Sequence, residues 1–423
     1  MAIRTWRYGL TANIVVFGVV SLLTDFSSEM ILPILPFYLI AALGANALIV
    51  GFIEGTADAV VAFMKVVSGR WSDVRGSRKR FVEVGYGLST VMKILFPFAQ
   101  SWPQFFGLRI VERLGKGVRD APRDALLTES TPADARGKAF GFHRSMDTAG
   151  AIIGPVVTLV LLAVLIPVWR EVPAYRLIIL IAALPAAVSL VFIGLVREPR
   201  RAAVPQPRFR ASLRTVPRSL LLFIGIASVF SFADFSVAFL LLRVTNVGET
   251  SVIAILLYVV FNIVYAIHAF PAGILSDRVG RKPVILVGYG AFVAMGVLLA
   301  ATPHILTLVL GFILYGLSYG MAEGTQRALV ADLAPKQAKA TVLGAYHTSV
   351  GFVKLASGIV AGLLWVTPSL TIHAGSFTLS FTLGPAATFW FGAATAAVAA
   401  ALLLLWRAPA RPSASGPVPP RPA

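Results

Sequence analysis

The stretch that decides the fold is GILSDRVGRKPVILVGYG, residues 273–290, because the chain carries a second version of it. Residues 69–87 read GRWSDVRGSRKRFVEVGYG. The two copies lie 204 residues apart up to Gly76 and Gly280, then 203 apart because Ser77 is an extra residue. Self-similarity at a fixed spacing indicates repeated structural units. The sequence therefore predicts two related halves in the same orientation.

A second pair of segments repeats at the same spacing. Residues 124–142, DALLTESTPADARGKAFGF, match residues 327–345, RALVADLAPKQAKATVLGA. The matched residues place Pro132 over Pro335. The repeat thus extends well beyond one loop.

The composition is that of a membrane protein. Hydrophobic residues make up 57% of the chain and charged residues 13%, whereas about a quarter of a soluble protein is charged. Apolar runs of about 20 residues recur, each long enough to cross the hydrocarbon core of a bilayer. Lipid permits only helices or closed barrels, and these runs lack the alternation of strands. We predict twelve membrane-spanning helices, near 13–42, 47–69, 81–101, 103–125, 139–167, 175–196, 218–242, 251–275, 283–302, 305–331, 340–366 and 378–406.

The net charge of +18 follows from the loops on one side of the membrane. Lys and Arg gather at the N-terminus, in alternate loops and in the C-terminal tail, and basic loops stay in the cytoplasm. We therefore expect both termini to be cytoplasmic, in a cell membrane whose anionic lipids the basic loops contact. This explains the charge without nucleic acid. The basic, apolar start lacks an A-x-A cleavage site, so it is predicted to be an uncleaved span.

These observations predict four segments. A six-helix bundle over 1–196 is followed by a basic cytoplasmic linker over 197–217, a second six-helix bundle over 218–406, and a disordered cytoplasmic tail over 407–423. The chain has no cysteine, which excludes disulfides and thiolate chemistry. Parallel halves of this kind place a substrate path between them near mid-bilayer.

At these residues the chain resembles the major facilitator superfamily over nearly its whole length. Residues 273–282, GILSDRVGRK, are similar to the family's G-x-x-x-D-R-x-G-R-K loop. The first copy keeps three of its residues but has Val74 in place of the basic residue. The resemblance implies an all-α fold of twelve transmembrane helices in two pseudo-symmetric six-helix bundles. It also implies that the two loops gate the conformational change, through Gly69, Asp73, Gly76, Gly273, Asp277, Arg278, Gly280 and Arg281.

The chemistry of these loop residues fits such a role. Gly69 and Gly273 would let two helices approach closely, and Gly280, like Gly76, would permit a tight turn. Asp73 and Asp277 lie at helix ends among cations, where a carboxylate can hold two helices together in one conformation and release them in another.

Two further motifs lie inside spans. Arg109 fits a buried arginine of the family's span 4, and the resemblance implies a role in proton coupling or gating. Span 5 resembles the motif of the antiporter branches, with Thr158 in place of its last glycine; the matching residues are Gly141, Gly150, Gly154 and Pro155. Glycines followed by proline predict a close-packed, kinked helix. Arg144 and Asp147, with His143, are expected to form gate salt bridges.

The acids of span 1 are the main candidates for a functional site. Asp25 and Glu29 are spaced i, i+4, so they share one helix face, and a charged side chain at mid-bilayer is energetically unfavourable. Three interpretations compete: a proton or substrate-cation site, an ion pair with a buried arginine, and an exposed position in the outer half. In the first case apolar surroundings favour proton exchange, and the shared face points to the central cavity. Pro33 and Pro36 should bend the helix just beyond.

Other intramembrane charges extend this set. Span 2 carries Glu54 and Asp58, of which Glu54 is nearer the outer end and Asp58 deeper; Asp234 is an isolated acid of span 7. The candidates for proton coupling or substrate binding are therefore Asp25, Glu29, Asp58, Arg109 and Asp234. A second polar set is expected in spans 10 and 11, from Glu323, Arg327, His347 and Lys354.

These features favour a secondary transporter that works by alternating access, and specifically a proton-driven efflux antiporter of small lipophilic or cationic molecules. The chain lacks a Walker A loop, so the proton gradient is the expected driving force. Alternatives are export of a metal ion or metal chelate, with Asp25, Glu29, Asp234 and His268 as donors, and proton-coupled import of a metabolite. A membrane-embedded transferase is disfavoured because no catalytic cluster is evident. We expect no enzyme activity, no cofactor, no resident metal, and a monomer that meets substrate, protons and lipid.

Overall fold

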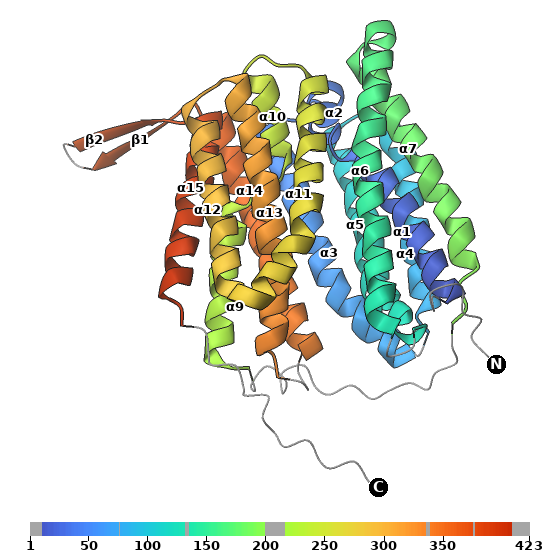
Figure 1. Ribbon diagram of the computed structural model, residues 1–423. Helices are drawn as coiled ribbons and strands as arrows, with labels where there is room; N and C mark the ends of the chain where they lie inside the picture. The colour runs from blue at the N-terminus through green and yellow to red at the C-terminus, as the bar shows by residue number, and fades with distance from the viewer. Residues whose placement is uncertain are drawn as a thin grey trace.

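Two groups of long, roughly parallel helices stand side by side in the structure, a computed structural model that describes residues 11–75, 77–131, 135–198, 216–335, 339–374 and 377–407 (Figure 1). The first group consists of α1 (Ala12–Ile31), α2 (Leu35–Leu43), α3 (Ala47–Arg75), α4 (Lys79–Leu95) with the short 3-10 helix η1 (Phe96–Phe98), α5 (Trp102–Glu129), α6 (Arg136–Trp169) and α7 (Glu171–Gly194). The second consists of α9 (Arg218–Ala233), α10 (Ala238–Asn246), α11 (Ser251–Val279), α12 (Arg281–Ala301), α13 (Ile305–Leu333), α14 (Lys339–Val366), β1 (Ser369–Ala374), β2 (Phe377–Thr382) and α15 (Pro385–Leu405). Gly76, most of the predicted linker and nearly all of the predicted tail lie outside the described residues.

The helices match the predicted spans in number and order. Within the described ranges, eleven helical segments are long and apolar enough to cross a membrane, with α9 and α10 together forming one of them. The twelfth, α5, occupies the position of predicted span 4 and carries charged residues from Arg109 to Asp124. The prediction of an all-α protein with twelve spans in two bundles is therefore confirmed.

Spans 1 and 7 are each broken into two helices. α1 ends at Ile31 and α2 begins at Leu35, so the chain turns just where Pro33 stands. α9 ends at Ala233 and α10 begins at Ala238, with Asp234 in a non-helical conformation after α9. Broken helices in equivalent positions of two halves mark the binding region in many transporters.

The predicted start of span 12 is wrong. Residues 378–382, placed in the span, belong to β2 (Phe377–Thr382), which pairs antiparallel with β1 from Ser369↔Thr382 to Ala374↔Phe377. The sequence of β2, FTLSFT, alternates apolar and polar residues, the period of a strand rather than of a helix. Helix α15 begins only at Pro385. The hairpin projects sideways from the second bundle (Figure 1).

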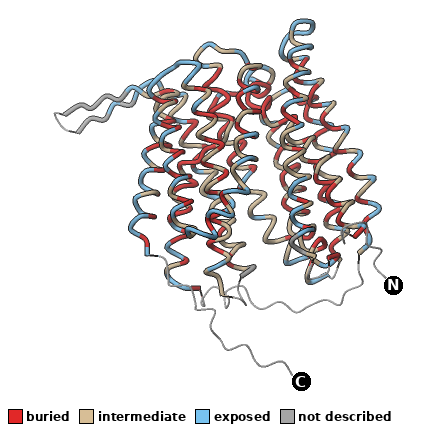
Figure 2. The backbone as a smooth tube through the Cα atoms, viewed as in Figure 1, coloured by how far each residue is buried: buried red, intermediate tan, exposed pale blue. Residues whose placement is uncertain are grey.

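Burial separates an inner and an outer surface on each bundle. Buried residues run through the inside of both bundles, and exposed residues lie on their outer sides (Figure 2). The exposed residues include large apolar side chains such as Val168, Phe270 and Leu405, which are 72%, 76% and 79% exposed. Such a surface is suited to hydrocarbon rather than to water. The chain is a multi-pass membrane protein.

Glycines bring α3 and α14 together across the two bundles. A Cβ atom added to Gly358 would lie 3.1 Å from the backbone carbon of Gly51, and one added to Gly55 would lie 2.8 Å from the Cα of Leu355. Small residues allow helices to approach this closely in membranes. The two bundles are therefore in direct backbone contact where Gly51 and Gly55 of α3 meet Gly358 and Leu355 of α14.

Candidate functional site

Of the two acids of α1, Glu29 lies where the bundles face each other. Asp25 and Glu29 are both partly buried, which excludes the interpretation that they occupy exposed positions. Glu29 accepts a hydrogen bond from the hydroxyl of Tyr258 on α11, at 2.7 Å. Among the described residues neither acid forms an ion pair, so the predicted pairing with a buried arginine is also wrong for this conformation. The Glu29–Tyr258 contact joins the first bundle to the second.

Helix α6 packs against α1 at these two acids. A Cβ atom added to Gly150 would lie 3.2 Å from the Cβ of Asp25, and one added to Gly154 would lie 2.8 Å from the Cβ of Glu29. Thr158, which replaces the last glycine of the antiporter-like motif, is buried and donates a hydrogen bond to the carbonyl oxygen of Met30 at 2.9 Å. The departure from the motif thus adds a bond between α1 and α6. Pro155 lies inside the continuous helix α6, while a Cβ atom at Gly141 would meet nothing within 4 Å.

Lys93 of α4 is a buried cation that the sequence reasoning missed. It is 2% exposed, and its Nζ donates to the hydroxyls of Ser27 and Ser28 on α1, both at 2.9 Å. A lone lysine in the apolar run of a predicted span is itself a functional signal, because intramembrane charges are rare. That signal was available at the sequence level.

A buried network of two acids and two arginines connects α3 with α5. Arg109 donates to both carboxylate oxygens of Glu54, at 3.0 and 3.2 Å from Nη2, and lies 3.3 Å from Glu112. Glu112 also lies 3.5 Å from Arg113. Arg109 is therefore buried, as the resemblance implied, and it is ion-paired; its role in coupling stays a prediction.

The two acids of α3 lie in different environments, which their depth along the span did not predict. Glu54, placed near the outer end, is buried in the network with Arg109. Asp58, placed deeper, is exposed and forms no hydrogen bond or ion pair with any residue that the structure describes. The i, i+4 spacing correctly gives a shared direction, but it does not say which neighbouring helix each residue meets.

Asp234 is not the isolated acid that the sequence predicted. Its carboxylate lies 3.0 Å from Nζ of Lys354 on α14. It also accepts hydrogen bonds from the hydroxyls of Tyr319 at 2.9 Å and Tyr315 at 3.3 Å. These partners come from α13 and α14, which lie far from Asp234 in sequence, so sequence spacing could not reveal them.

A chain of polar contacts runs from α6 across α11 to α13. Arg144 donates to the hydroxyl of Tyr265 at 2.6 Å, and that hydroxyl donates to Glu323 at 3.1 Å. Glu323 is paired with Arg327 at 2.5 Å. Within α6, Asp147 lies 3.9 Å from Arg144 and 3.6 Å from His143, and it accepts a hydrogen bond from Ser21 of α1. Arg144 therefore connects the two bundles as well as lying near Asp147.

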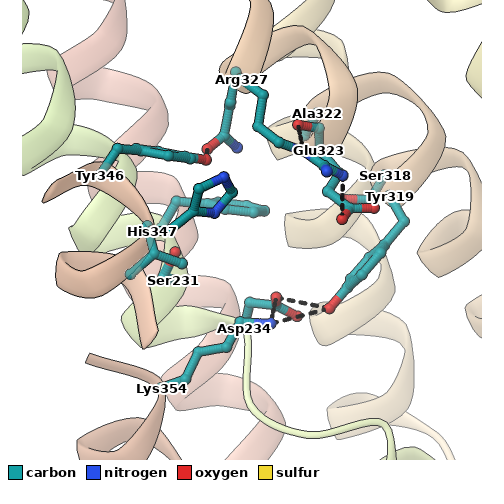
Figure 3. A pocket seen from close by; sticks show the side chains of 13 residues that line it. Ser231, Asp234, Ser318, Tyr319, Ala322, Glu323, Arg327, Tyr346, His347 and Lys354 are labelled. Atoms are coloured by element: carbon teal, nitrogen blue, oxygen red, sulfur yellow. Dashed lines mark hydrogen bonds and ion pairs between the residues drawn. The ribbon is translucent and has the colours of Figure 1, made fainter. Parts of the chain in front are cut away.

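The second polar set surrounds a cavity inside the second bundle (Figure 3). Its volume is about 150 Å³, and its lining includes Asp234, Glu323, Arg327, His347 and Lys354. The sequence grouped the last four of these correctly. A separate crevice of about 510 Å³ lies between α6, α11 and α13, and Tyr319 and Arg327 line both spaces.

The two repeated loops form matching ion-pair clusters. Arg78 lies 2.5 Å from Asp73 of α3 and 2.7 Å from Glu129 of α5. In the second half, Arg281 lies 2.7 Å from Asp277 of α11 and 3.1 Å from Asp332 of α13. The arginines, like Glu129 and Asp332, are 203 residues apart, as the repeat requires. Each arginine therefore joins helices at the end of its bundle.

The glycines of these loops differ in what they do. Gly280 has φ 95°, a conformation that favours glycine, so the predicted turn is present. Gly69 lies close to Ala121 of α5, at 3.2 Å from an added Cβ atom. The close helix contact predicted at Gly273 is absent, because an added Cβ atom would meet nothing within 4 Å of the described residues. Arg278 is exposed.

The metal donors suggested by the sequence lie in separate settings. Glu29 bonds to Tyr258, Asp234 pairs with Lys354, and Nδ1 of His268 lies 2.8 Å from a carbonyl oxygen of its own helix. Within the described ranges there is no group of three His, Asp or Glu side chains that could hold a metal ion.

Two helical bundles with polar groups at their interface define a membrane transporter. A family model described as the Major Facilitator Superfamily matches residues 17–355 and 221–423, and the chain belongs to that superfamily. An uncharacterized MFS-type transporter of Methanocaldococcus jannaschii is 37% identical over 374 residues, covering 87% of this chain and 92% of that protein. A probable 4-methylmuconolactone transporter of Cupriavidus pinatubonensis is 27% identical over 344 residues, 78% of each chain. The structure of a D-xylose-proton symporter matches the fold with a TM-score of 0.73 at 15% identity, covering 93% of this chain and 97% of that one.

Proposed function

We propose that this protein is a proton-coupled secondary transporter that exports a small organic molecule in exchange for protons by alternating access. The observation that carries the proposal is the hydrogen bond between Glu29 of α1 and Tyr258 of α11. An ionised carboxylate only accepts hydrogen bonds, whereas a protonated one also donates. Protonation of Glu29 would therefore change a contact between the bundles, and in alternating access these bundles move against each other.

The packing of α6 supports exchange rather than simple uniport. Gly150 and Gly154 place the backbone of α6 directly against α1 at Asp25 and Glu29. A change in the protonation of either acid would act at once on α6, whose Arg144 contacts Tyr265 of the second bundle. Through this arrangement the antiporter-like motif would link proton binding to movement of the bundles.

The direction of transport is tested together with the coupling. Purified protein reconstituted in liposomes with an internal pH-sensitive dye would be supplied with organic anions, neutral compounds, cations and metal ions, in both gradient directions. Import driven by the proton gradient would favour the symporter alternative. Proton release coupled only to a metal ion would favour the metal exporter.

Neutralising the two acids tests the coupling itself. The double variant Asp25→Asn, Glu29→Gln should abolish uphill, gradient-driven efflux, while exchange without a gradient survives because alternating access itself needs no proton there. Glu83→Gln is a matched control, since its side chain is 42% exposed on α4 and, among the described residues, pairs only with Lys79, one helical turn away. If the double variant still pumps uphill with unchanged pH dependence, coupling lies elsewhere, with Asp58 and Asp234 the next acids to test.

A further inference from the structure

The cavity of the second bundle is lined by both apolar and polar residues. The apolar ones include Phe230 of α9, Ala322 of α13 and Val350 of α14. Phe230 is fixed in place because its ring stacks on that of Tyr289, with centroids 3.8 Å apart and planes 4° apart. The polar lining includes two ion pairs, Asp234 with Lys354 and Glu323 with Arg327 (Figure 3). A small molecule with one polar end would fit such a space.

The acidic groups of this cavity are already satisfied. The carboxylate of Asp234 is paired with Lys354 and accepts hydrogen bonds from the hydroxyls of Tyr315 and Tyr319. The carboxylate of Glu323 is paired with Arg327 and accepts a hydrogen bond from the hydroxyl of Tyr265. A cationic ligand would have to displace one of these donors before it could bind a carboxylate.

The donors of the cavity, by contrast, have unused capacity. An ammonium group has three N–H donors and a guanidinium group five. Among the described residues, Nζ of Lys354 meets only Asp234 and the hydroxyl of Tyr319, and Arg327 uses Nε and Nη2 on Glu323. The amide oxygen of Gln326 accepts from Tyr346, and its NH₂ group has no bonded partner in the same part of the chain. The unused hydrogen-bonding capacity therefore consists largely of N–H donors.

Ser318 adds an independent observation. It lines the cavity and is fully buried, and its Oγ has no hydrogen-bond partner among the described residues. Its counterpart in the first half, 203 residues earlier, is Gly115. Both positions lie at a close helix contact: an added Cβ atom on Gly85 would lie 2.6 Å from the oxygen of Gly115, and one on Gly288 would lie 3.1 Å from that of Ser318. Packing needs only a small residue here, so the buried hydroxyl calls for a partner that the protein does not supply.

We infer that this cavity binds the anionic end of the substrate, and that the substrate class is a small organic carboxylate with an apolar body. The inference rests on the proposed transport function, because it names the substrate of that transporter. A carboxylate accepts several hydrogen bonds and donates none, which matches the unused donors of Lys354, Arg327 and Gln326 and leaves both ion pairs intact. It replaces the lipophilic or cationic substrate that the sequence favoured.

The cavity lies next to the crevice between the bundles. Tyr319 and Arg327 form a wall shared with the crevice between α6, α11 and α13. Arg144 of the first bundle lines that crevice, so an anion passing from it into the cavity meets a second guanidinium before Arg327. The path is thus positively charged on the side from which the substrate enters or leaves.

Three probes that share a benzene ring and carry one anionic, neutral or cationic polar group test the substrate class. Benzoate, benzamide and benzylammonium would be titrated calorimetrically into the full-length protein in lipid nanodiscs, without a pH gradient. We expect benzoate to bind at least tenfold more tightly than benzamide, and benzylammonium more weakly still. Benzylammonium binding as tightly as benzoate, or no binding of benzoate, overturns the inference.

Variants locate the bound anion. Ser318→Ala should weaken benzoate binding about tenfold, the loss expected for one hydrogen bond to a charged group. Ser228→Ala is its matched control, because Ser228 lies on α9 outside the cavity and bonds to its own helix through the carbonyl of Ile224. Arg327→Gln should weaken benzoate binding, whereas Glu323→Gln should strengthen it by releasing Arg327. Unchanged benzoate affinity in both Ser318→Ala and Arg327→Gln would place the anion elsewhere and overturn the inference.

Equilibrium binding separates this inference from the proposed function. Benzoate binding without any gradient-driven transport would contradict only the proposed coupling. Gradient-driven transport together with preferred binding of benzylammonium would contradict only the substrate class.

Discussion

Replacing Arg109 should destabilise the first bundle more than replacing the acid that it binds. In the part of the chain that the structure describes, every hydrogen bond to the carboxylate of Glu54 comes from Arg109, with donor–acceptor distances of 3.0, 3.2 and 3.2 Å. Arg109→Leu therefore leaves a buried carboxylate alone, which typically lowers the free energy of unfolding by about 3–5 kcal/mol. Arg109→Lys keeps the charge but loses the planar pair of donors, so it should also impair transport.

Glu54→Gln should be milder, because Arg109 keeps its contact with Glu112 at 3.3 Å and the new amide oxygen still accepts a hydrogen bond. We expect a loss of about 1–2 kcal/mol. The double variant Glu54→Gln, Arg109→Leu should be more stable than Arg109→Leu alone, because it leaves no unpaired carboxylate at residue 54.

Unfolding in mixed micelles, followed by far-ultraviolet circular dichroism, measures these differences. Glu83→Gln serves as the control, since a partly exposed pair contributes less than about 1 kcal/mol. Equal losses for Arg109→Leu and Glu54→Gln, or a double variant whose loss is the sum of the two, would refute the reasoning. Full transport by Arg109→Lys would show that the planar pair of donors is not needed.

Three further predictions concern helix contacts. Arg281→Gln should slow transport more than Asp277→Asn, because Arg281 also binds Asp332 and Ser276. Both variants should leave substrate affinity close to wild type. A loss of substrate affinity with normal turnover would contradict this prediction. Gly358→Val should block transport by forcing α14 away from α3. Gly225→Val should not, because a Cβ atom added to Gly225 would meet no described residue within 4 Å. Initial transport rates of the two variants in liposomes test this difference. Thr158→Val should lower the free energy of unfolding by about 0.6 kcal/mol, the average for a hydrogen bond between membrane helices, and an unchanged value would show that its bond to Met30 contributes nothing.

The number of spans and the two-half plan could be predicted because lipid leaves the backbone few alternatives. Apolar runs of a fixed length must be helical, and a repeat at one spacing fixes how the halves correspond. The hairpin at β1 and β2 was missed for a different reason. The alternation in FTLSFT was present in the sequence, but the apolar stretch that follows it favoured a longer helix.

The partners of the intramembrane charges could be predicted only in part. Spacing along one helix shows which residues share a face, as for Asp25 and Glu29, but it does not identify the helix that the face meets. The pairing of Asp234 with Lys354 joins residues 120 positions apart, and that of Glu54 with Arg109 joins residues 55 positions apart. These contacts depend on how whole helices pack, which composition and periodicity do not determine.

The ion-pair clusters around Arg78 and Arg281 are two versions of one arrangement within the same molecule. The two share an arginine, an aspartate and a second acid at matched positions, yet the first has Val74 and the extra Ser77 where the second has Arg278 and no insertion. The same substitution made in each loop therefore tests the same contact twice, in two variants of one scaffold. Any difference in transport between the two variants shows how far the two loops differ in their contribution to the conformational change.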